Sequence, residues 1–387
     1  MTTTAPARPP SAPGGGTGTG RRTAVPVRFW SGRVSFRLHR RTALVSAAAL
    51  LLCAALLLAS LCVGAYPVPL PAVADALFYG TGDRLAVHFV NQERLPQALL
   101  AILVGAALGV SGAIFQSISR NALASPDVIG FNSGAATGAI LVLVTVGSAA
   151  STVAAGAIAG GLLTALVVSA LASRGGLHGI RLVLIGLGVT AMLGSVNSYL
   201  LTRSDLNDAQ NAHVWLVGTL AGRGWSSVNT MALALLVLLP LALLLGRRLR
   251  MLELGDELAS GLGLEVNRAR LALTVLGIGL CGVAVASAGP IPFVALAAPQ
   301  VAVMVSRSPG VSVAASAAMG AVLLSAAHLA SGQFFAALAA LDAQIGWIDV
   351  VSESRRNNLL PVGVTTGVLG GVYLAWVLFR RRGTGSA

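Results

Sequence analysis

Long apolar stretches, each followed by a short polar connection, recur along almost the whole chain. A helix needs roughly 20 apolar residues to cross the hydrocarbon core of a bilayer, and the pattern predicts about ten such helices. These spans cover residues 43–65, 95–117, 128–147, 149–172, 182–201, 229–246, 271–289, 293–306, 311–330 and 359–379. The eighth span is short and contains Pro299, which leaves its ends open. The pattern predicts an all-α membrane protein.

Arginine residues gather at both ends of the chain. Residues 1–42 are rich in Thr, Pro, Gly and Arg without any acidic residue, which predicts a disordered basic tail. This tail is not a signal peptide, because the apolar stretch after it is long and lacks a cleavage site. Arginines also occupy positions 380–382, at the start of a short tail over residues 381–387. Because Arg marks cytoplasmic flanks, we predict a multi-pass protein of the cell membrane with both termini cytoplasmic.

The composition excludes several classes of protein. Hydrophobic residues make up 55% of the 387 residues and charged residues only 10%, whereas soluble domains carry about 25% charged residues. The chain contains no Lys, which excludes a Walker A loop and Schiff-base catalysis on this chain. The net charge of +13 lies mainly beside the spans without interleaved aromatic residues, which argues against nucleic-acid binding.

No group of residues in the sequence predicts catalysis or metal binding. The 13 acidic residues lie in connections or at the ends of spans. Cys53, Cys62 and Cys281 show neither disulfide spacing nor metal-site spacing. His328 is the only histidine well inside a span, where a packing hydrogen bond is commoner than a proton relay. We therefore predict no enzyme activity, metal site or cofactor here, and active transport would need energy from another subunit.

Small residues recur at a spacing of four in three places, a pattern typical of close helix packing in membranes. The three sets are Gly130, Gly134 and Gly138; Gly156 and Gly160; and Gly363, Gly367 and Gly371.

One charged stretch, "LELGDELASGLGLEVNRAR" at 252–270, interrupts the apolar pattern between spans six and seven. Asp256 and Glu257 follow Gly255 and would begin a short helix, where carboxylates complement the helix dipole. Its apolar stripe is formed by leucines spaced by four residues, and glycines would end it. Such an amphipathic helix fits either a groove on a soluble partner or the lipid surface. The acidic face disfavours an anionic leaflet and therefore favours the partner.

Five long stretches match one family in chain order. They are "RLPQALLAILVGAALGVSGAIFQSISRNALASPDVIGFNSGA" (94–135), "VWLVGTLAGRGW" (214–225), "GDELASGLGLEVNRAR" (255–270), "AGPIPFVALAAPQ" (288–300) and "LLPVGVTTGVLGG" (359–371). On these motifs, residues 43–380 resemble the FecCD-type permeases, the membrane subunits of ABC importers for iron–siderophores, haem and cobalamin. The resemblance implies the ABC type II importer permease fold.

The resemblance also implies partners for this domain. It implies a homodimer or heterodimer of permeases, an ABC ATPase subunit that binds ATP, and a substrate-binding lipoprotein outside the cell. The segment 252–270 would couple the permease to the ATPase. Its expected contact residues are Leu254, Gly255, Asp256, Glu257, Leu258, Leu262 and Gly263.

The same resemblance places the transport pathway along span five and its preceding loop, "GGLHGIR" at 175–181. The expected gate and pathway residues are His178, Gly179, Ser195, Asn197, Ser198, Tyr199 and Thr202. Their polar side chains suit a wet pore wall.

The extracellular side departs from the family pattern. In the family, arginines dock the binding protein; Arg94 matches one of them, but Gln97 and Ser331 replace two others. An insert at 332–358 carries Arg355 and Arg356, which we expect to supply the missing positive charge. An inert, solvated loop is the alternative.

On this resemblance, we expect a permease subunit that imports a ferric siderophore, with energy from a separate ATPase. Cobalamin or haem could replace the siderophore on the same fold, and the sequence does not name the ligand. An ion-coupled secondary transporter is the less favoured alternative, because no carboxylate lies within a span.

Overall fold

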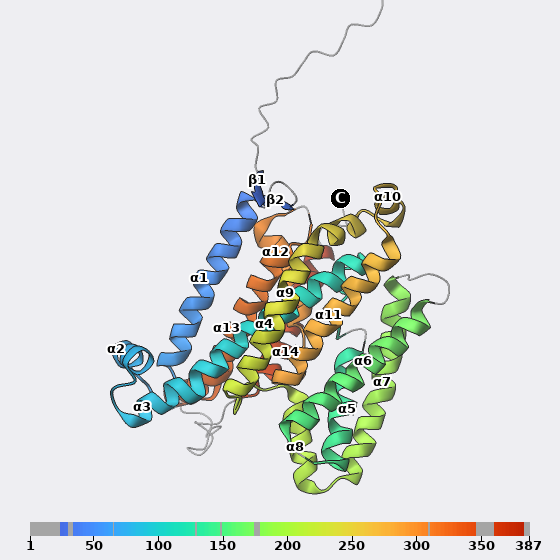
Figure 1. Cartoon of the computed structure of the whole chain (residues 1–387). Helices are drawn as coiled ribbons and strands as arrows, with labels where there is room; N and C mark the ends of the chain where they lie inside the picture. Colours follow the sequence, from blue (N-terminus) through green and yellow to red (C-terminus); the bar gives the residue numbers. More distant parts are fainter. Residues whose placement is uncertain are drawn as a thin grey trace, which may run out of the picture. The chain divides into compact units, whose positions relative to one another are not determined.

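The computed structural model describes residues 24–29, 34–64, 66–127, 130–147, 149–173, 179–308, 310–345 and 360–382. The chain divides into two units, Met1–Arg40 and Arg41–Ala387. Nearly all described residues of the second unit lie in helices (Figure 1).

The first unit contains a β-hairpin. Strands β1 (Ala24–Phe29) and β2 (Val34–His39) pair antiparallel, with Ala24 opposite His39 and Phe29 opposite Val34. These two strands lie within the stretch 1–42 for which we predicted a disordered tail, and residues 1–23 and 30–33 lie outside the described residues. Val and Phe occur in both strands, and β-branched and aromatic residues favour extended chain. The average composition of the tail concealed this local pattern.

Each of the ten predicted spans coincides with a helix. They are α1 (Arg40–Cys62), α4 (Leu95–Ser119), α5 (Phe131–Thr145), α6 (Ala150–Ser173), α7 (Gly179–Arg203), α9 (Trp225–Glu253), α11 (Val266–Ala288), α12 (Val294–Ser306), α13 (Val313–Ile345) and α14 (Val362–Arg382). Among the described residues, seven helices are long and apolar enough to cross a membrane. The other three have shorter apolar stretches: α5, α12 and, over Val362–Ala375, α14.

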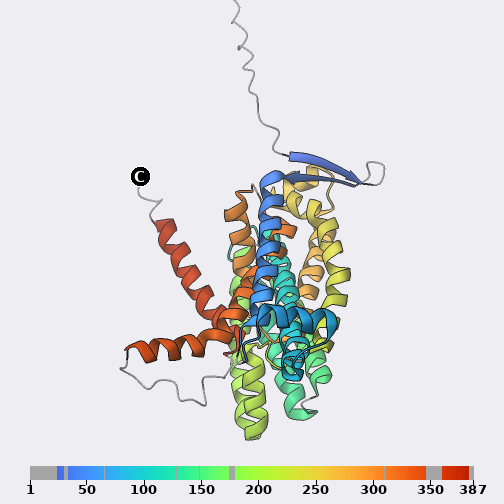
Figure 2. The same cartoon turned by 90° about the vertical axis from the view of Figure 1, so that its left-hand side faces the viewer.

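Short helices lie at the two ends of the spans. Helices α2 (Leu70–Ala74) and α3 (Arg84–His88), the π-helical turns η1 (Asp75–Tyr79) and η2 (Phe89–Arg94), and α8 (Leu206–Val217) lie at one end. Helix α10 (Asp256–Gly261) lies at the other (Figure 1). The described end of α14 points to the same end as α10 (Figures 1 and 2).

Helix α4 is the central helix of the second unit. It packs against α9, α11, α12 and α13, and glycines let two of these helices come very close. A Cβ at Gly105 would lie 2.4 Å from the carbonyl oxygen of Gly320 on α13, and one at Gly112 only 1.7 Å from that of Ala295 on α12. Real side chains do not tolerate such distances, so this packing depends on glycine at both positions.

The predicted glycine stripes of α5 and α6 do pack together. A Cβ at Gly138 would lie 2.1 Å from the carbonyl oxygen of Gly156, and one at Gly160 would lie 2.3 Å from that of Gly134. The close packing predicted for the third glycine set, on α14, is found at only part of the set. Gly363 lies against the carbonyl oxygen of Val217, whereas Gly371 faces open space.

Helix α12 begins inside the bundle and contains Pro299. Proline has no N–H, so the carbonyl of Ala295, four residues earlier, loses its helical donor. Gln116 of α4 donates to the neighbouring carbonyl of Leu296 at 2.9 Å, and Gln300 donates to Gln116 at 2.6 Å. These amide groups bind α12 to α4 in the core.

Helix α13 continues beyond the predicted end of span nine at residue 330. It runs to Ile345, so the first half of the predicted insert at 332–358 is helix rather than loop. The alanine-rich sequence of this part favours helix. Residues 346–359, including Arg355 and Arg356, lie outside the described residues.

Candidate functional site

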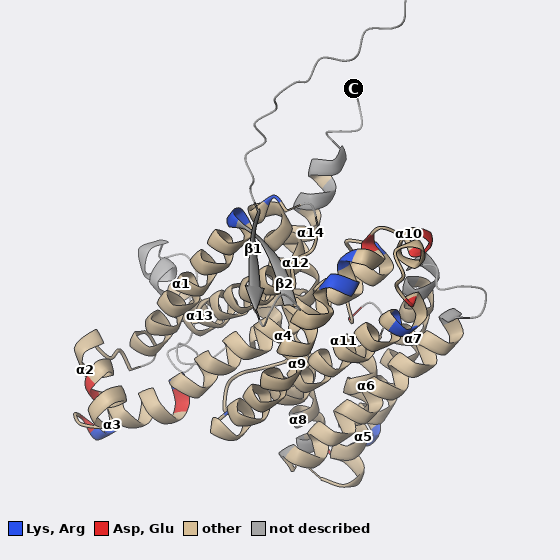
Figure 3. Ribbon diagram, turned by 45° about the horizontal axis from the view of Figure 1, so that its top comes forward, with Lys and Arg blue, Asp and Glu red and all other residues tan. Residues whose placement is uncertain are grey.

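Helix α10 forms where the sequence predicted it. Gly255 has φ of 104°, a backbone conformation that favours glycine, and it separates α9 from α10. Asp256 and Glu257 lie in the first turn of α10, and Gly263 follows its end with φ of 82°. Figure 3 shows acidic residues on and beside α10, close to arginines of neighbouring helices.

The predicted apolar stripe of α10 is uncovered. Leu254, Leu258 and Leu262 are 56%, 63% and 61% exposed, whereas Ala259 is fully buried. Three large apolar side chains are thus exposed to solvent beside a cluster of charged residues, at the turn between α9 and α10. Such a row suits the groove of another protein, because an exposed leucine gains free energy only when it is covered.

The two acidic residues of the first turn have different surroundings. Arg270 of α11 donates from Nη2 to both carboxylate oxygens of Asp256 at 2.9 Å, and Nη2 of Arg120 lies 3.9 Å from Oδ1. Glu257, by contrast, is exposed. Asp256 is therefore bound within this chain, whereas the side chain of Glu257 faces solvent.

Glu253 is a member of this cluster that the sequence did not predict. Its Oε1 accepts hydrogen bonds from the hydroxyl of Ser117 at 2.7 Å and from the backbone N–H of Val311 at 3.4 Å. The signal in the sequence was weak, because Glu253 precedes the turn and resembles an ordinary residue at the end of a helix.

The predicted pathway residues lie on α7, and His178 lies outside the described residues. Gly179 is the first residue of α7. Hydroxyls of Ser195, Ser198 and Thr202 each donate to a carbonyl four residues earlier, at 3.2, 3.1 and 2.8 Å. These residues are exposed, so their side chains line an open face.

Tyr199 and Asn197 complete this set. The Arg203 guanidinium lies 5.8 Å from the centre of the Tyr199 ring, which is 61% exposed. Asn197 Oδ1 is buried and has no hydrogen-bond partner within the described part of the chain. Helix α7 packs against α5, α6 and α8. The face that carries the hydroxyls also exposes Leu184 and Met192.

Arg94 is engaged within the chain. Its Nη1 donates to the carbonyl of Leu61 at 2.8 Å and its Nη2 to that of Tyr66 at 2.5 Å. The guanidinium is half-buried at the end of α1, and at least two of its five donors are occupied. A docking role would therefore use its remaining donors or its charge.

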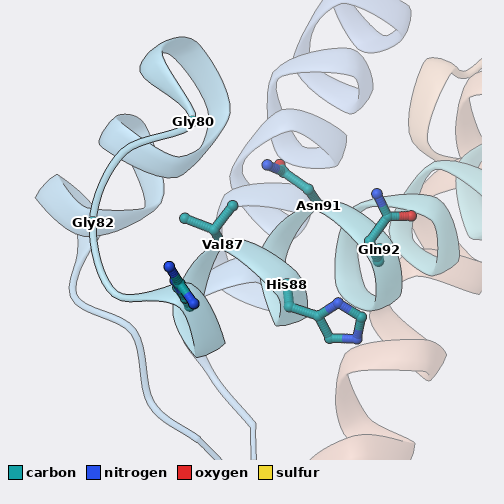
Figure 4. Close-up of a pocket in the computed structure, with 7 residues that line it drawn as sticks. Gly80, Gly82, Val87, His88, Asn91 and Gln92 are labelled. Carbon is teal, nitrogen blue, oxygen red and sulfur yellow. The ribbon is translucent and has the colours of Figure 1, made fainter.

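An open hollow of about 320 Å³ lies on the segment between α1 and α4. Figure 4 shows His88, Asn91 and Gln92 along one helix and the turn with Gly80 and Gly82 facing them. Nearby, the Tyr66 hydroxyl donates to Asp83 at 2.9 Å, and this bond to a carboxylate raises the pKa of Tyr66. The sequence did not predict this hollow.

Comparison of the sequence with known proteins finds one transport family. The profile of the FecCD transport family matches residues 51–380. The chain is 40% identical to the ferric enterobactin transport system permease protein FepG of Escherichia coli (strain K12), over 85% of this chain and 96% of FepG. It is 35% identical to the achromobactin transport system permease protein CbrC of Dickeya dadantii (strain 3937), over 92% and 97%. It is 33% identical to the hemin transport system permease protein HmuU of Yersinia pestis, over 76% and 84%.

A solved structure has the same fold. A metal-chelate type ABC transporter in an inward-facing conformation superposes with a TM-score of 0.72 over 87% of this chain and 99% of that chain, at 24% identity.

Proposed function

Because the chain belongs to the FecCD transport family, we propose that it is the membrane-spanning subunit of an ATP-driven importer for a ferric siderophore. The observation that carries this proposal is α10, a short helix at one end of the spans that exposes Leu258 and is flanked by the exposed Leu254 and Leu262. A separate ATPase subunit covers these leucines and supplies the energy.

The ligand class follows from the relatives. FepG and CbrC are named for ferric enterobactin and achromobactin, and both align over more than four fifths of this chain. HmuU, named for hemin, is less similar and covers less of this chain. A ferric siderophore is therefore the first candidate ligand and haem the second.

A second permease subunit covers the open faces of α7 and α14. Leu184 and Met192 on α7 are 64% and 66% exposed, and Val368 and Val372 on α14 are 63% and 66% exposed. Figure 2 shows α14 standing away from the other helices toward its end. Substrate would pass along the hydroxyl-bearing face of α7, between the two permease subunits.

The membrane orientation follows from charge. The end with α10 also carries Arg247, Arg248 and Arg250, and the positive-inside rule places such an end in the cytoplasm. Both termini are then cytoplasmic, and the end with α2, α3 and α8 receives the substrate-binding lipoprotein.

The test is uptake of radioactive iron by cells that lack this chain and are then given it back. Iron would be supplied separately as ferric enterobactin, achromobactin, ferric citrate and hemin. We expect uptake of a ferric siderophore to return with the chain and to require an ATPase subunit able to hydrolyse ATP. Uptake of hemin alone would show that haem, and not a ferric siderophore, is the ligand. Uptake that survives loss of the ATPase would favour an ion-coupled transporter.

A further inference from the structure

Two carboxylates flank the turn at Gly255, one on each side. Glu253 is the last residue of α9, and Asp256 is the first residue of α10. The φ of 104° at Gly255 marks a sharp change in chain direction. Without further contacts, a push on α10 could be absorbed by rotation about this turn.

Glu253 holds the near side of the turn to two other parts of the fold. Its Oε1 accepts from Ser117 of α4 at 2.7 Å, and Ser117 is only 2% exposed. The same oxygen accepts from the N–H of Val311, between α12 and α13, at 3.4 Å. A Cβ at Gly310 would lie 2.7 Å from Glu253 Oε2, so glycine leaves room for the carboxylate.

Asp256 holds the far side of the turn. It accepts from Nη2 of Arg270 at 2.9 Å through both oxygens, and the Arg270 side chain is 13% exposed. Within the described residues, Nε of Arg270 is buried without a partner. Loss of the Asp256 charge would leave a buried cation without compensation, which is unfavourable. Arg120, which closes α4 with φ of 50°, lies 3.9 Å from the same carboxylate.

Ser117 and Arg120 lie one turn apart at the end of α4. Glu253 is bound to this end directly through Ser117, whereas Asp256 is bound to Arg270 of α11 and only approaches Arg120 at 3.9 Å. Helix α4 belongs to a continuous helical stretch, Arg84–Ser119. The opposite end of this stretch is formed by residues 84–94, which belong to the segment between α1 and α4. One rod therefore joins the end that carries α10 to the opposite end of the spans.

We propose that Glu253 and Asp256 are positioning residues that hold the turn between α9 and α10 to the end of α4. Glu253 does so directly through Ser117, and Asp256 does so through Arg270 of α11, a helix that packs against α4. Displacement of α10 by the ATPase then moves α4 as a rod and reaches the extracellular segment at residues 84–94. The reverse also holds, because coupling between two sites is reciprocal. This inference rests on the proposed function, since it assumes an ATPase on α10.

The test compares hydrogen–deuterium exchange in the assembled complex without nucleotide and with ATP and vanadate. The variants are Asp256→Asn and Ser117→Ala; the second removes only the hydrogen bond to Glu253 and keeps the side chain small. The control is Glu265→Gln, which removes a carboxylate from the exposed pair of Glu265 and Arg268, whose side chains are 66% and 83% exposed. Stimulation of ATP hydrolysis by the ligand-free binding protein is measured on the same complexes.

In the wild type and the control, nucleotide should change exchange in both α10 and residues 84–94. In the two variants, the change in α10 should remain and the change in residues 84–94 should be lost. Stimulation by the binding protein should fall by about fivefold in both variants, the effect expected for residues that carry coupling. Basal hydrolysis should stay the same in Ser117→Ala, because Ser117 is buried away from the expected ATPase contact.

Wild-type responses at both ends in both variants would overturn the inference. It would also be overturned if nucleotide caused no change in hydrogen–deuterium exchange at residues 84–94 of the wild type. Loss of the ATPase from the variants would overturn it as well, because the residues would then act in ATPase binding. Failure of the wild-type chain to assemble with an ATPase is a separate result that would remove the proposed function itself.

Discussion

The guanidinium of Arg94 closes the carboxyl end of helix α1, because its Nη1 donates a 2.8 Å hydrogen bond to the carbonyl oxygen of Leu61. The last carbonyls of a helix have no partner within the helix, and an arginine satisfies both their hydrogen bonds and the local dipole. A residue expected to dock a partner is therefore also part of the fold.

Substitution Arg94→Ala should lower stability as well as docking. We expect a loss of about 1–2 kcal/mol, the usual range for a hydrogen bond to a charged group with partial exposure. Thermal unfolding of the purified chain in detergent measures this effect. Arg84→Ala, on the same segment, is the control and should change the unfolding temperature little. Unchanged stability in Arg94→Ala would leave docking as its only role.

Substitution Gly112→Ala should disrupt the contact between α4 and α12. The new methyl group would lie 1.7 Å from the carbonyl oxygen of Ala295, and overpacking of this kind costs about 1–3 kcal/mol or more. The control Gly371→Ala adds a methyl group in open space and should be neutral or slightly stabilising. Thermal unfolding and yield of folded protein compare the two. Equal stability of both variants would contradict the packing.

Substitution Leu258→Ala should weaken binding of the ATPase subunit without unfolding the chain. Leu258 is 63% exposed, so its removal leaves no cavity in the free chain. Covering a leucine contributes about 1.5–3 kcal/mol, so the affinity should fall at least about tenfold. Leu236→Ala on α9 is the control, because Leu236 is 72% exposed and lies away from α10. Equal binding by both variants would exclude the leucine stripe as the contact.

The membrane orientation can be tested with single cysteines. In a chain whose three native cysteines are replaced, Ser386→Cys should be protected from an impermeant thiol reagent in intact cells. Asp205→Cys, beside α8, should react. Labelling at position 386 from outside the cell would show that the orientation is the opposite of the proposed one.

Substitution of both Arg355 and Arg356 by Glu should weaken binding of the lipoprotein to the reconstituted transporter. Charges at the rim of an interface act mainly on the association rate. The effect should be greatest at low salt, because the Debye length is about 30 Å at 0.01 M ionic strength. An unchanged affinity at low salt would show that this part of the chain is not used in docking.

The sequence alone was sufficient to locate the ten span helices, because their signal is local. Each span is a run of apolar side chains, and a bilayer requires backbone hydrogen bonds to be satisfied within the helix. Helix α10 was predictable for a similar reason, since Gly255, the paired acids and the spaced leucines all lie within eleven residues of the chain, 252–262. The stripes on α5 and α6 also followed from spacing.

Only the tertiary structure decided which partner each polar group and each glycine has. Ser117 and Glu253 are 136 positions apart, and Gln116 and Gln300 are 184 apart, so no local pattern joins them. The same limit applies to Gly112 and Ala295, whose contact depends on how α4 crosses α12. Spacing along the chain shows which residues share a helix face. Packing between helices selects their partners, and therefore also the residues that connect α10 to the rest of the protein.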